Sequence, residues 1–416
     1  PSMGALRPYS WYKYFPENDI YPIVITRKWK GKINSINDYS ENDTGNKQEN
    51  ESHNGTIIKI PYKNSLKDKL ILYNKFKYIR KALTLVEEIT KWFSFLFDEK
   101  RFLYKEAKEV IENQKIDFII VSGKPFILFR YASKLSKKYS IPWFADYRDG
   151  WYTNHVKKNN NIEKLISKYE LFFEKKYLKS ALSLISVSYK LIEKIQSNCF
   201  PINGILHPNG FDNTLFNNKL NFNKRNQFFK ITYAGSIYDR QNISAFIYGF
   251  KSFCDNNKVN NIKLKFIGIN LRPSKNTNEI NNLKYEFPEI IEIVPSMTHE
   301  NVIAELINSS LLLKFNVSKQ SEGLIGGKVY ELIATGNPIL TILNESENND
   351  IDFPEKKFQN FASNKEEVEI ILSNYFEMFM NGKILSNGLT KNEAYEFSRE
   401  HNVKKLADEI KSLINK

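Results

Sequence analysis

Short apolar runs rich in β-branched residues alternate with segments of helical periodicity along most of this chain. Strands that are apolar on both faces have to be covered on both faces, so this alternation predicts a parallel sheet with helices on either side. The alternation runs from Ile23 to Val187, stops near residue 210 and starts again at Lys230. The sequence therefore predicts an α/β protein in which one pattern occurs twice.

The expected strands are Ile23–Thr26, Ile57–Ile60, Phe118–Val121, Trp143–Asp146, Ser183–Val187, Lys230–Ala234, Lys263–Gly268, Ile290–Val294, Leu311–Phe315 and Pro338–Leu340. The expected helices are Tyr9–Phe15, Lys67–Glu88, Tyr104–Asn113, Phe126–Lys138, Ile162–Leu178, Tyr189–Gln196, Ile243–Asp255, Gly327–Thr335, Lys365–Phe379 and Lys391–Lys416. The stretch 33–55 is rich in Asn, Ser, Asp and Glu without periodicity, and it predicts a loop.

A chain of 416 residues is too long for one ordinary core and predicts two domains of about 200 residues each. The turn His207–Asp212, followed by the polar run Asn213–Gln227, is the expected linker. We therefore expect a first domain over 1–212 and a second over 213–390. The segment 391–416 is expected to be a helix that crosses back to the first domain.

Composition excludes several classes of protein. A chain with 41% apolar and 26% charged residues is not expected to be disordered as a whole. No run approaches about 18 apolar residues and no signal peptide is visible at the start, so no bilayer-spanning helix or leader is predicted. Cys199 and Cys254 are far apart in sequence, and a reducing cytoplasm is the simplest compartment. The histidines lack metal-ligand spacing, so zinc is not expected.

The net charge of +14 predicts an anionic partner. Tyr62–Lys108 carries twelve Lys or Arg and ten aromatic residues against six Asp or Glu. In one interpretation this segment lies on anionic lipid with Trp92 and Phe95 at the interface, gaining about 1 kcal/mol per well-placed cation. In the other, Trp92, Phe93 and Leu96 face the core and the lysines are merely solvated.

Two glycines, Gly326 and Gly327, stand at the start of a predicted helix. Bare backbone amides and the positive end of the helix dipole can approach a phosphate there. Lys328 adds a cation in a first turn, where cations are otherwise disfavoured. Glu331 follows one turn later, where its carboxylate could hold a ribose diol. An ordinary βα turn with a capping glycine is the alternative explanation.

The run Gly326–Leu340 resembles the donor-binding segment of the GT-B glycosyltransferases of family 4. In that family a lysine, an aromatic residue and a glutamate open the last nucleotide-binding helix, which ends in a Gly-x-Pro turn. Four other segments agree with the family in order and spacing, and they are Gly4–Tyr9, Asp146–Trp151, His207–Asp212 and Tyr233–Ser236. A strand is expected before the first of them, where the sequence begins. The resemblance implies the GT-B fold, in which two Rossmann-like domains face a central cleft.

The resemblance implies donor-binding roles for Gly4, Gly235, Arg240, Glu322, Gly326, Gly327, Lys328 and Glu331. Glu331 matches the family's ribose-binding glutamate. Many members have a second glutamate eight positions earlier, where this chain has Gly323, and Glu322 is one residue out of register. A second cation that often follows the position of Arg240 is not evident here, and Lys328 could supply that charge. The base is expected near Val294–Ser296.

The chemistry implied needs few groups. Arg240, Lys328 and the helix amides are expected to stabilise the departing diphosphate in place of a magnesium ion, so neither metal nor cofactor is expected. Arg7, Arg148 and Asp149 are the expected acceptor-side residues. Asp149 could orient or deprotonate the acceptor hydroxyl, or it could form a structural ion pair with Arg148 or Arg7.

Together these features predict a hexosyl- or related transferase that moves a sugar from a nucleoside-diphosphate donor to a saccharide acceptor. The resemblance implies retention of anomeric configuration. The basic segment suggests a lipid-linked acceptor in bacterial surface-polysaccharide (lipopolysaccharide) assembly, at the cytoplasmic face of the membrane. A sugar-nucleotide epimerase of similar fold and a non-catalytic nucleotide-binding scaffold are the alternatives. No nucleic-acid-binding motif is present, so nucleic acid is not an expected partner.

Overall fold

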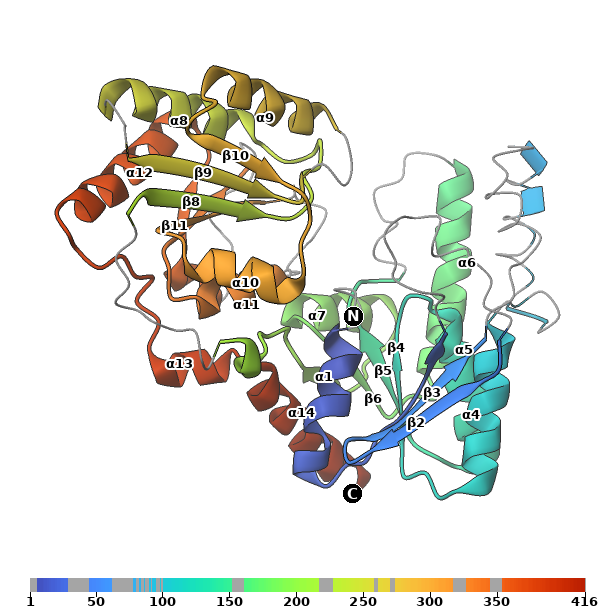
Figure 1. Cartoon of the computed structure of the whole chain (residues 1–416). Coiled ribbons are helices and arrows are strands. Elements are labelled where there is room, and N and C mark those ends of the chain that lie inside the picture. Colours follow the sequence, from blue (N-terminus) through green and yellow to red (C-terminus); the bar gives the residue numbers. More distant parts are fainter. Residues whose placement is uncertain are drawn as a thin grey trace. The chain divides into compact units, whose positions relative to one another are not determined.

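The computed structural model describes residues 6–28, 45–61, 100–151, 161–216, 227–257, 261–269, 274–316, 327–344 and 354–415, with scattered positions between 78 and 98. The chain forms two compact units. Unit 1 comprises Pro1–Pro208 and Val403–Lys416, and unit 2 comprises Asn209–Asn402. The division thus follows residue 208, four positions before the boundary predicted from the linker turn. The α/β prediction is confirmed, because each unit carries parallel strands flanked by helices (Figure 1).

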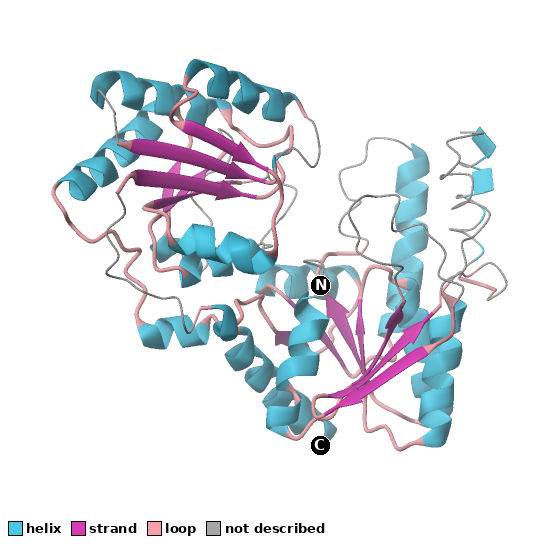
Figure 2. Ribbon diagram, viewed as in Figure 1, coloured by secondary structure: helices cyan, strands magenta, loops and turns pink. Residues whose placement is uncertain are grey.

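Unit 2 is built on one six-stranded parallel sheet (Figure 2). Its strands are β8 (Phe229–Ala234), β9 (Ile262–Ile267), β10 (Ile291–Val294), β11 (Leu311–Phe315), β12 (Ile339–Ile342) and β13 (Asn360–Ala362). The spatial order is β10-β9-β8-β11-β12-β13, which is 3-2-1-4-5-6 in chain order and defines a doubly wound sheet. The order reverses between β8 and β11, and ligands of such sheets bind at the carboxyl ends of the strands beside this switch point.

Helices cover both faces of the unit 2 sheet. In Figure 1, α8 (Ser244–Asn257), α9 (Lys275–Glu286) and α12 (Lys365–Met380) lie on one face, and α10 (His299–Ile307) and α11 (Gly327–Ala334) lie on the other. The shorter elements are α13 (Lys391–Glu396), η5 (Asn213–Leu215) and η7 (Pro354–Phe358). Phe246, Phe250 and Phe253 of α8 are fully buried against the sheet, which follows from their helical spacing.

Two sheets support unit 1. Strands β4 (Ile119–Ser122), β5 (Trp143–Tyr147), β6 (Ser183–Ser186) and β7 (Gly204–Leu206) are parallel and adjacent in that order. The second sheet has β1 (Ile23–Arg27) parallel to β3 (Gly55–Ile60), with β2 (Gln48–Ser52) antiparallel to β3. The helices are α1 (Leu6–Tyr14), η2 (Pro16–Asn18), α4 (Arg101–Asn113), α5 (Ile127–Tyr139), α6 (Asn161–Leu178), α7 (Tyr189–Asn198) and the end of α14 (Arg399–Ile414).

The C-terminal helix returns to unit 1 as predicted. From Val403 onward, α14 packs its buried face, including Leu406 and Ile410, into a cluster with Trp11 of α1 and Phe144 of β5. The predicted single helix over 391–416 is instead two helices. Ser398 separates them, because its side chain accepts a hydrogen bond from the His401 N–H at 3.1 Å and so caps α14.

Other expectations about secondary structure were wrong or fall outside the description. The expected loop 33–55 contains β2 and the start of β3, which pair as a hairpin. Most of the expected helix Lys67–Glu88 lies outside the described residues. Helices α9 and α10 were not predicted, although the side chains of Ser274 and Thr298 cap them by accepting hydrogen bonds from N–H groups of their first turns. Within the described part of the chain, no helix is both long and apolar enough to cross a bilayer.

Candidate functional site

The end of β8 brings two of the predicted donor-site residues together. Gly235 follows β8 with φ +134°, a conformation that L side chains rarely adopt. Its N–H donates to the Ile267 carbonyl at 2.9 Å, which fixes it to the end of β9. A Cβ atom at this position would collide with Nζ of Lys328. Only glycine therefore allows the ammonium to lie against the backbone at the switch point.

Buried amide side chains fix the loop that follows Gly235. The Gln241 amide nitrogen donates to the Phe315 carbonyl at 3.1 Å, and its oxygen accepts from the Tyr238 N–H at 2.8 Å. Asn276 donates to the carbonyls of Tyr238 and Gln241 at 2.9 and 2.8 Å. These contacts join the loop to the end of β11, across the point where strand order reverses. Arg240 lies exposed in the same loop.

Lys328 is the second residue of α11, after Gly327. Its side chain keeps solvent contact, yet the protein packed around the ammonium lowers its pKa from 10.5, because incomplete hydration penalises the charged form. The carboxylate of Glu331 acts in the opposite direction. Three other predicted donor-site residues, Gly4, Glu322 and Gly326, lie outside the described residues.

Glu331 is buried, and two cationic or basic side chains hold it. Nε2 of His299 lies 3.0 Å from its Oε1, and NH2 of Arg399 lies 3.5 Å from the same oxygen. The hydrogen bond with Glu331 raises the pKa of His299 above 6.5, while burial of the imidazole opposes the rise. His299 begins α10 and Arg399 begins α14. Neither residue was among the site residues predicted from the sequence.

The segment predicted to border the base also lies at the carboxyl edge of the unit 2 sheet. The Val294 carbonyl at the end of β10 accepts from the Gly268 N–H at 3.0 Å. Ser296 lies beside Gly268, which has φ +73°. The ends of β8, β9 and β10 are thus joined by successive backbone hydrogen bonds from Gly235 and Gly268. A role for this segment in base binding remains a prediction.

In unit 1, Arg7 is a buried anchor. Its Nε and NH2 donate to Oδ1 of Asp146 at 2.9 and 2.8 Å, and its NH1 donates to the His207 carbonyl at 2.6 Å. The Arg7 and Asp146 side chains are 4% and 0% exposed. The ion pair ties α1 to the end of β5. Arg7 therefore has a structural role in unit 1. An acceptor-side role for Arg7 remains a prediction.

Asp149 lies in the turn after β5 and keeps access to solvent. Its Oδ2 is 3.1 Å from Nζ of Lys124, and the two side chains are 40% and 51% exposed. This partner differs from the two that the sequence suggested, Arg148 and Arg7. Exposed pairs of this kind contribute only about 0–1 kcal/mol, so the carboxylate is not locked in place. Arg148 is half-buried beside it, and the catalytic role of Asp149 remains a prediction.

The proposed interfacial role of Trp92 is wrong. Trp92 is 5% exposed and stacks on Trp151, Phe173 and Tyr177, with ring centroids 5.1, 5.0 and 5.8 Å apart. The core interpretation is right for Trp92 and wrong for Phe93, which is 68% exposed. Phe95 and Leu96, the other aromatic and apolar residues named for this segment, lie outside the described residues.

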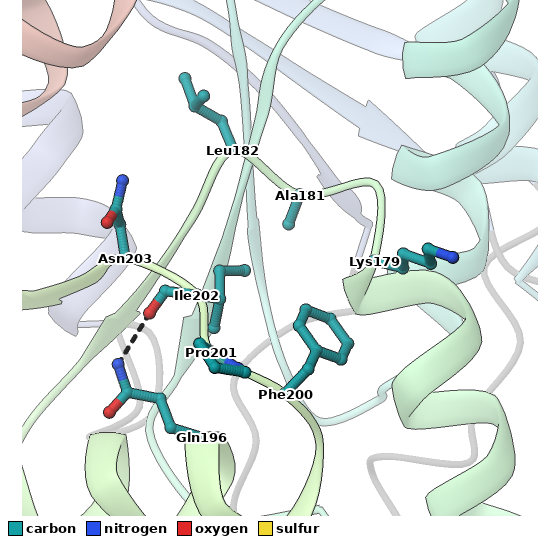
Figure 3. Close-up of a pocket in the computed structure, with 8 residues that line it drawn as sticks. All are labelled: Lys179, Ala181, Leu182, Gln196, Phe200, Pro201, Ile202 and Asn203. Atoms are coloured by element: carbon teal, nitrogen blue, oxygen red, sulfur yellow. Dashed lines mark hydrogen bonds between the residues drawn. The ribbon is translucent and has the colours of Figure 1, made fainter.

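A shallow pocket of about 560 Å³ in unit 1 does not coincide with these groups (Figure 3). It is lined by Lys179, Ala181, Leu182, Gln196, Phe200, Pro201, Ile202 and Asn203. Leu182 directly precedes β6 and Asn203 directly precedes β7, so the pocket lies at the amino-terminal edge of the sheet. Ligands of parallel α/β sheets bind at the opposite edge, and we do not assign this pocket to the site. Among the described residues, no group of three or more His, Cys, Asp or Glu side chains is placed to hold a metal ion.

No family model matches the chain, and no curated protein matches its sequence. Solved structures share its architecture. A sucrose-phosphate synthase from Thermosynechococcus elongatus superposes with a TM-score of 0.62 at 12% identity, covering 99% of this chain and 93% of that one. A UDP-forming α,α-trehalose-phosphate synthase from Burkholderia xenovorans gives 0.58 at 11% identity, covering 94% and 98%. HepE of Anabaena, in complex with UDP-glucose, gives 0.50 at 11% identity, covering 80% and 96%. The chain has the GT-B fold, with two Rossmann-like domains.

Proposed function

We propose that this chain is a glycosyltransferase whose nucleoside-diphosphate sugar donor binds at the carboxyl edge of the unit 2 sheet. The observation that carries the proposal is the meeting of Gly235 and Lys328 at the switch point, with buried Glu331 one turn further along the same helix. A diphosphate needs a cation and free amides, and a ribose needs a fixed acceptor for its hydroxyl groups. HepE of Anabaena, whose structure is similar, was solved in complex with UDP-glucose, and this supports a nucleoside-diphosphate sugar as the ligand proposed here.

The chemistry follows from these groups. As the bond from the sugar to the diphosphate breaks, negative charge develops on the leaving group. Lys328, Arg240 and the amides at the start of α11 stabilise that charge without a divalent cation. Asp149 orients or deprotonates the acceptor hydroxyl, since its carboxylate is accessible and only loosely paired. We assign the chain to family 4, and with it retention of configuration, on the five motifs in its sequence.

We further propose that the acceptor is a saccharide on a lipid carrier, used in bacterial surface-polysaccharide assembly at the inner face of the membrane. Exposed apolar side chains and nearby lysines of unit 1 support this membrane location. Phe93, Leu165 and Phe172 are 68%, 70% and 58% exposed, and Nζ of Lys176 lies 5.9 Å from the Phe172 ring. Aromatic side chains interleaved with cations suit the boundary between lipid headgroups and acyl chains.

A donor assay tests the proposal. The protein is incubated with UDP-, GDP-, ADP- and dTDP-glucose in excess chelator, with and without a polyprenyl-diphosphate-linked saccharide, and the released nucleotide is measured. The proposal predicts release from one donor class, faster with acceptor, and unaffected by the chelator. Conversion of a donor into its epimer without nucleotide release would instead identify an epimerase. Binding of a donor without turnover under all conditions would identify a non-catalytic scaffold. Activity that needs added magnesium or manganese would contradict the metal-independent mechanism.

A further inference from the structure

We infer that His299 is a positioning residue for the ribose of the bound nucleotide. By holding one oxygen of Glu331, it turns the other oxygen of that carboxylate toward the ribose hydroxyls, and so sets the preference for ribonucleotides over 2′-deoxyribonucleotides. The inference rests on the proposed function, because it assumes that a nucleotide binds on unit 2.

The contacts of Glu331 are one-sided. His299 Nε2 at 3.0 Å and Arg399 NH2 at 3.5 Å both meet Oε1, and Oε2 takes part in neither contact. Each oxygen of an ionised carboxylate can accept about two hydrogen bonds. With Oε1 occupied by two donors, Oε2 is the oxygen with acceptor capacity for a hydroxyl. The Glu331 side chain is only 7% exposed, so its orientation is set by these partners rather than by solvent.

His299 makes the stronger of the two contacts. A separation of 3.0 Å is normal for a nitrogen–oxygen hydrogen bond, whereas 3.5 Å is at the limit. His299 is also fixed in place, because it is the first residue of α10 and Thr298 caps that helix through the Asn301 N–H at 3.4 Å. A flexible glutamate that is clamped at Oε1 by a side chain on a capped helix keeps one rotamer. Loss of the clamp would let the carboxylate turn toward Arg399 or Lys328.

Charged groups of both signs surround the His299 imidazole. Arg399 from α14 disfavours a charged His299, whereas Glu331 from α11 and Glu300 from α10 favour one. The neutral tautomer protonated on Nε2 can donate the same hydrogen bond as the cation. The clamp therefore depends on the Nε2–H donor and does not require a net charge. Glutamine at this position would offer an amide N–H in its place.

The experiment compares ribose selectivity between variants by calorimetry. UDP, ADP and GDP, each with its 2′-deoxy analogue, are titrated into the wild type and into the variants His299→Ala, His299→Gln, Glu331→Ala and His299→Ala/Glu331→Ala. His53→Ala serves as the matched control, since it removes an exposed histidine from the β2–β3 turn of unit 1. Far-UV circular dichroism and thermal unfolding establish that each variant is folded.

We expect the wild type to prefer the ribose form of the nucleotide that it binds. His299→Ala should reduce that preference about tenfold, which is the effect of one charge-assisted hydrogen bond. His299→Gln should restore most of it, and His299→Ala should have no further effect once Glu331 is removed. Unchanged selectivity in His299→Ala, or an equal loss of ribose and deoxyribose forms, would overturn the inference and leave the proposed function standing. dTDP is titrated into the wild type as well, and failure to bind any of these seven nucleotides would overturn the proposed function itself.

Discussion

The ammonium of Lys328 lies in the space that a side chain on Gly235 would fill. Gly235 lies in the turn after β8, and Lys328 lies in the first turn of α11. The cation and the backbone that it contacts are thus separated by 92 residues in the sequence. The arrangement places a positive charge at the switch point of the sheet, against a residue that has no side chain. Under the proposed function, this charge would meet the diphosphate of the donor.

Replacement of Gly235 by Ala should therefore weaken nucleoside-diphosphate binding. The new Cβ would displace the flexible lysine, and alanine is strained at φ +134°, at a cost of about 1–3 kcal/mol in folding stability. Gly388→Ala is the matched control, because Gly388 also has positive φ but nothing lies within 4 Å of its Cβ position. Both variants should be destabilised in urea, and only Gly235→Ala should lose affinity. Equal affinities in the two variants would contradict the account.

Lys328→Ala should lose about 2 kcal/mol of affinity for a nucleoside diphosphate and little for the corresponding nucleoside, since one charged hydrogen bond to phosphate is removed. Lys275→Ala is the control, because Lys275 also lies in the first turn of a unit 2 helix and is 84% exposed. Calorimetry of both variants provides the comparison. Equal losses for nucleoside and diphosphate would argue against a phosphate contact.

The lowered pKa of Lys328 predicts the pH dependence of binding. The ammonium is charged below that pKa, so diphosphate affinity should be full at lower pH and fall as pH rises through a value below 10.5. A bound diphosphate favours the charged form and should move this transition to higher pH. Titrations across alkaline pH measure the change. A wild-type profile identical to that of Lys328→Arg, whose guanidinium stays charged, would rule out Lys328 as the titrating group.

His299 links the stability of unit 2 to pH. Its pKa in the folded chain is raised above 6.5, so its stabilising contribution is fully present below about pH 6.5 and is lost as pH rises through the folded-state value. All five tryptophans lie in unit 1, so their fluorescence does not report on unit 2. Amide hydrogen exchange of α10 and α11, corrected for intrinsic rates, should show protection falling from pH 6 to 8.5. His299→Gln should flatten the decline, and an unchanged decline would assign it to other groups.

Trp92 and Phe93 are adjacent in sequence and should behave oppositely. Trp92→Ala removes a buried ring from an aromatic stack and should cost about 3–5 kcal/mol of folding stability. Phe93→Ala removes an exposed ring, so it should change stability little while lowering sedimentation with anionic vesicles at low salt. Neutral vesicles and high salt serve as controls, because surface attraction is screened over about 8–10 Å near physiological ionic strength. Equal vesicle binding by wild type and Phe93→Ala would remove Phe93 from the membrane contact.

The strands of unit 2 could be predicted because a doubly wound sheet buries both of their faces. Leu311–Phe315, for example, is apolar at every position except Lys314, and the observed strand has the same bounds. Strand β2 could not be predicted in this way, since Gln48–Ser52 is polar and exposed along its whole length. It forms only because β3 offers an edge to pair with. The formation of β2 therefore depends on its partner strand, and its own residues do not indicate a strand.

Some residues of the candidate site could likewise be predicted from the sequence, and others could not. Gly235, Lys328 and Glu331 could be proposed from local motifs, because glycine, lysine and glutamate at a helix start carry a chemical meaning of their own. His299 and Arg399 are 32 and 68 residues from Glu331, and no local pattern joins them to it. The buried pair of Arg7 and Asp146, 139 residues apart, is a tertiary contact of the same kind, which only the fold brings together.

Calorimetric titration of nucleoside diphosphates into the wild type and Glu331→Ala, in the presence of excess chelator, tests most directly whether the donor binds beside Glu331. We expect at least one ribonucleoside diphosphate to bind the wild type without a metal ion. The same nucleotide should bind Glu331→Ala more weakly by about 1–3 kcal/mol, because a charged hydrogen-bond acceptor for the ribose is lost. Unchanged affinity of Glu331→Ala for every nucleotide that the wild type binds, or binding that appears only with added divalent cation, would contradict these expectations.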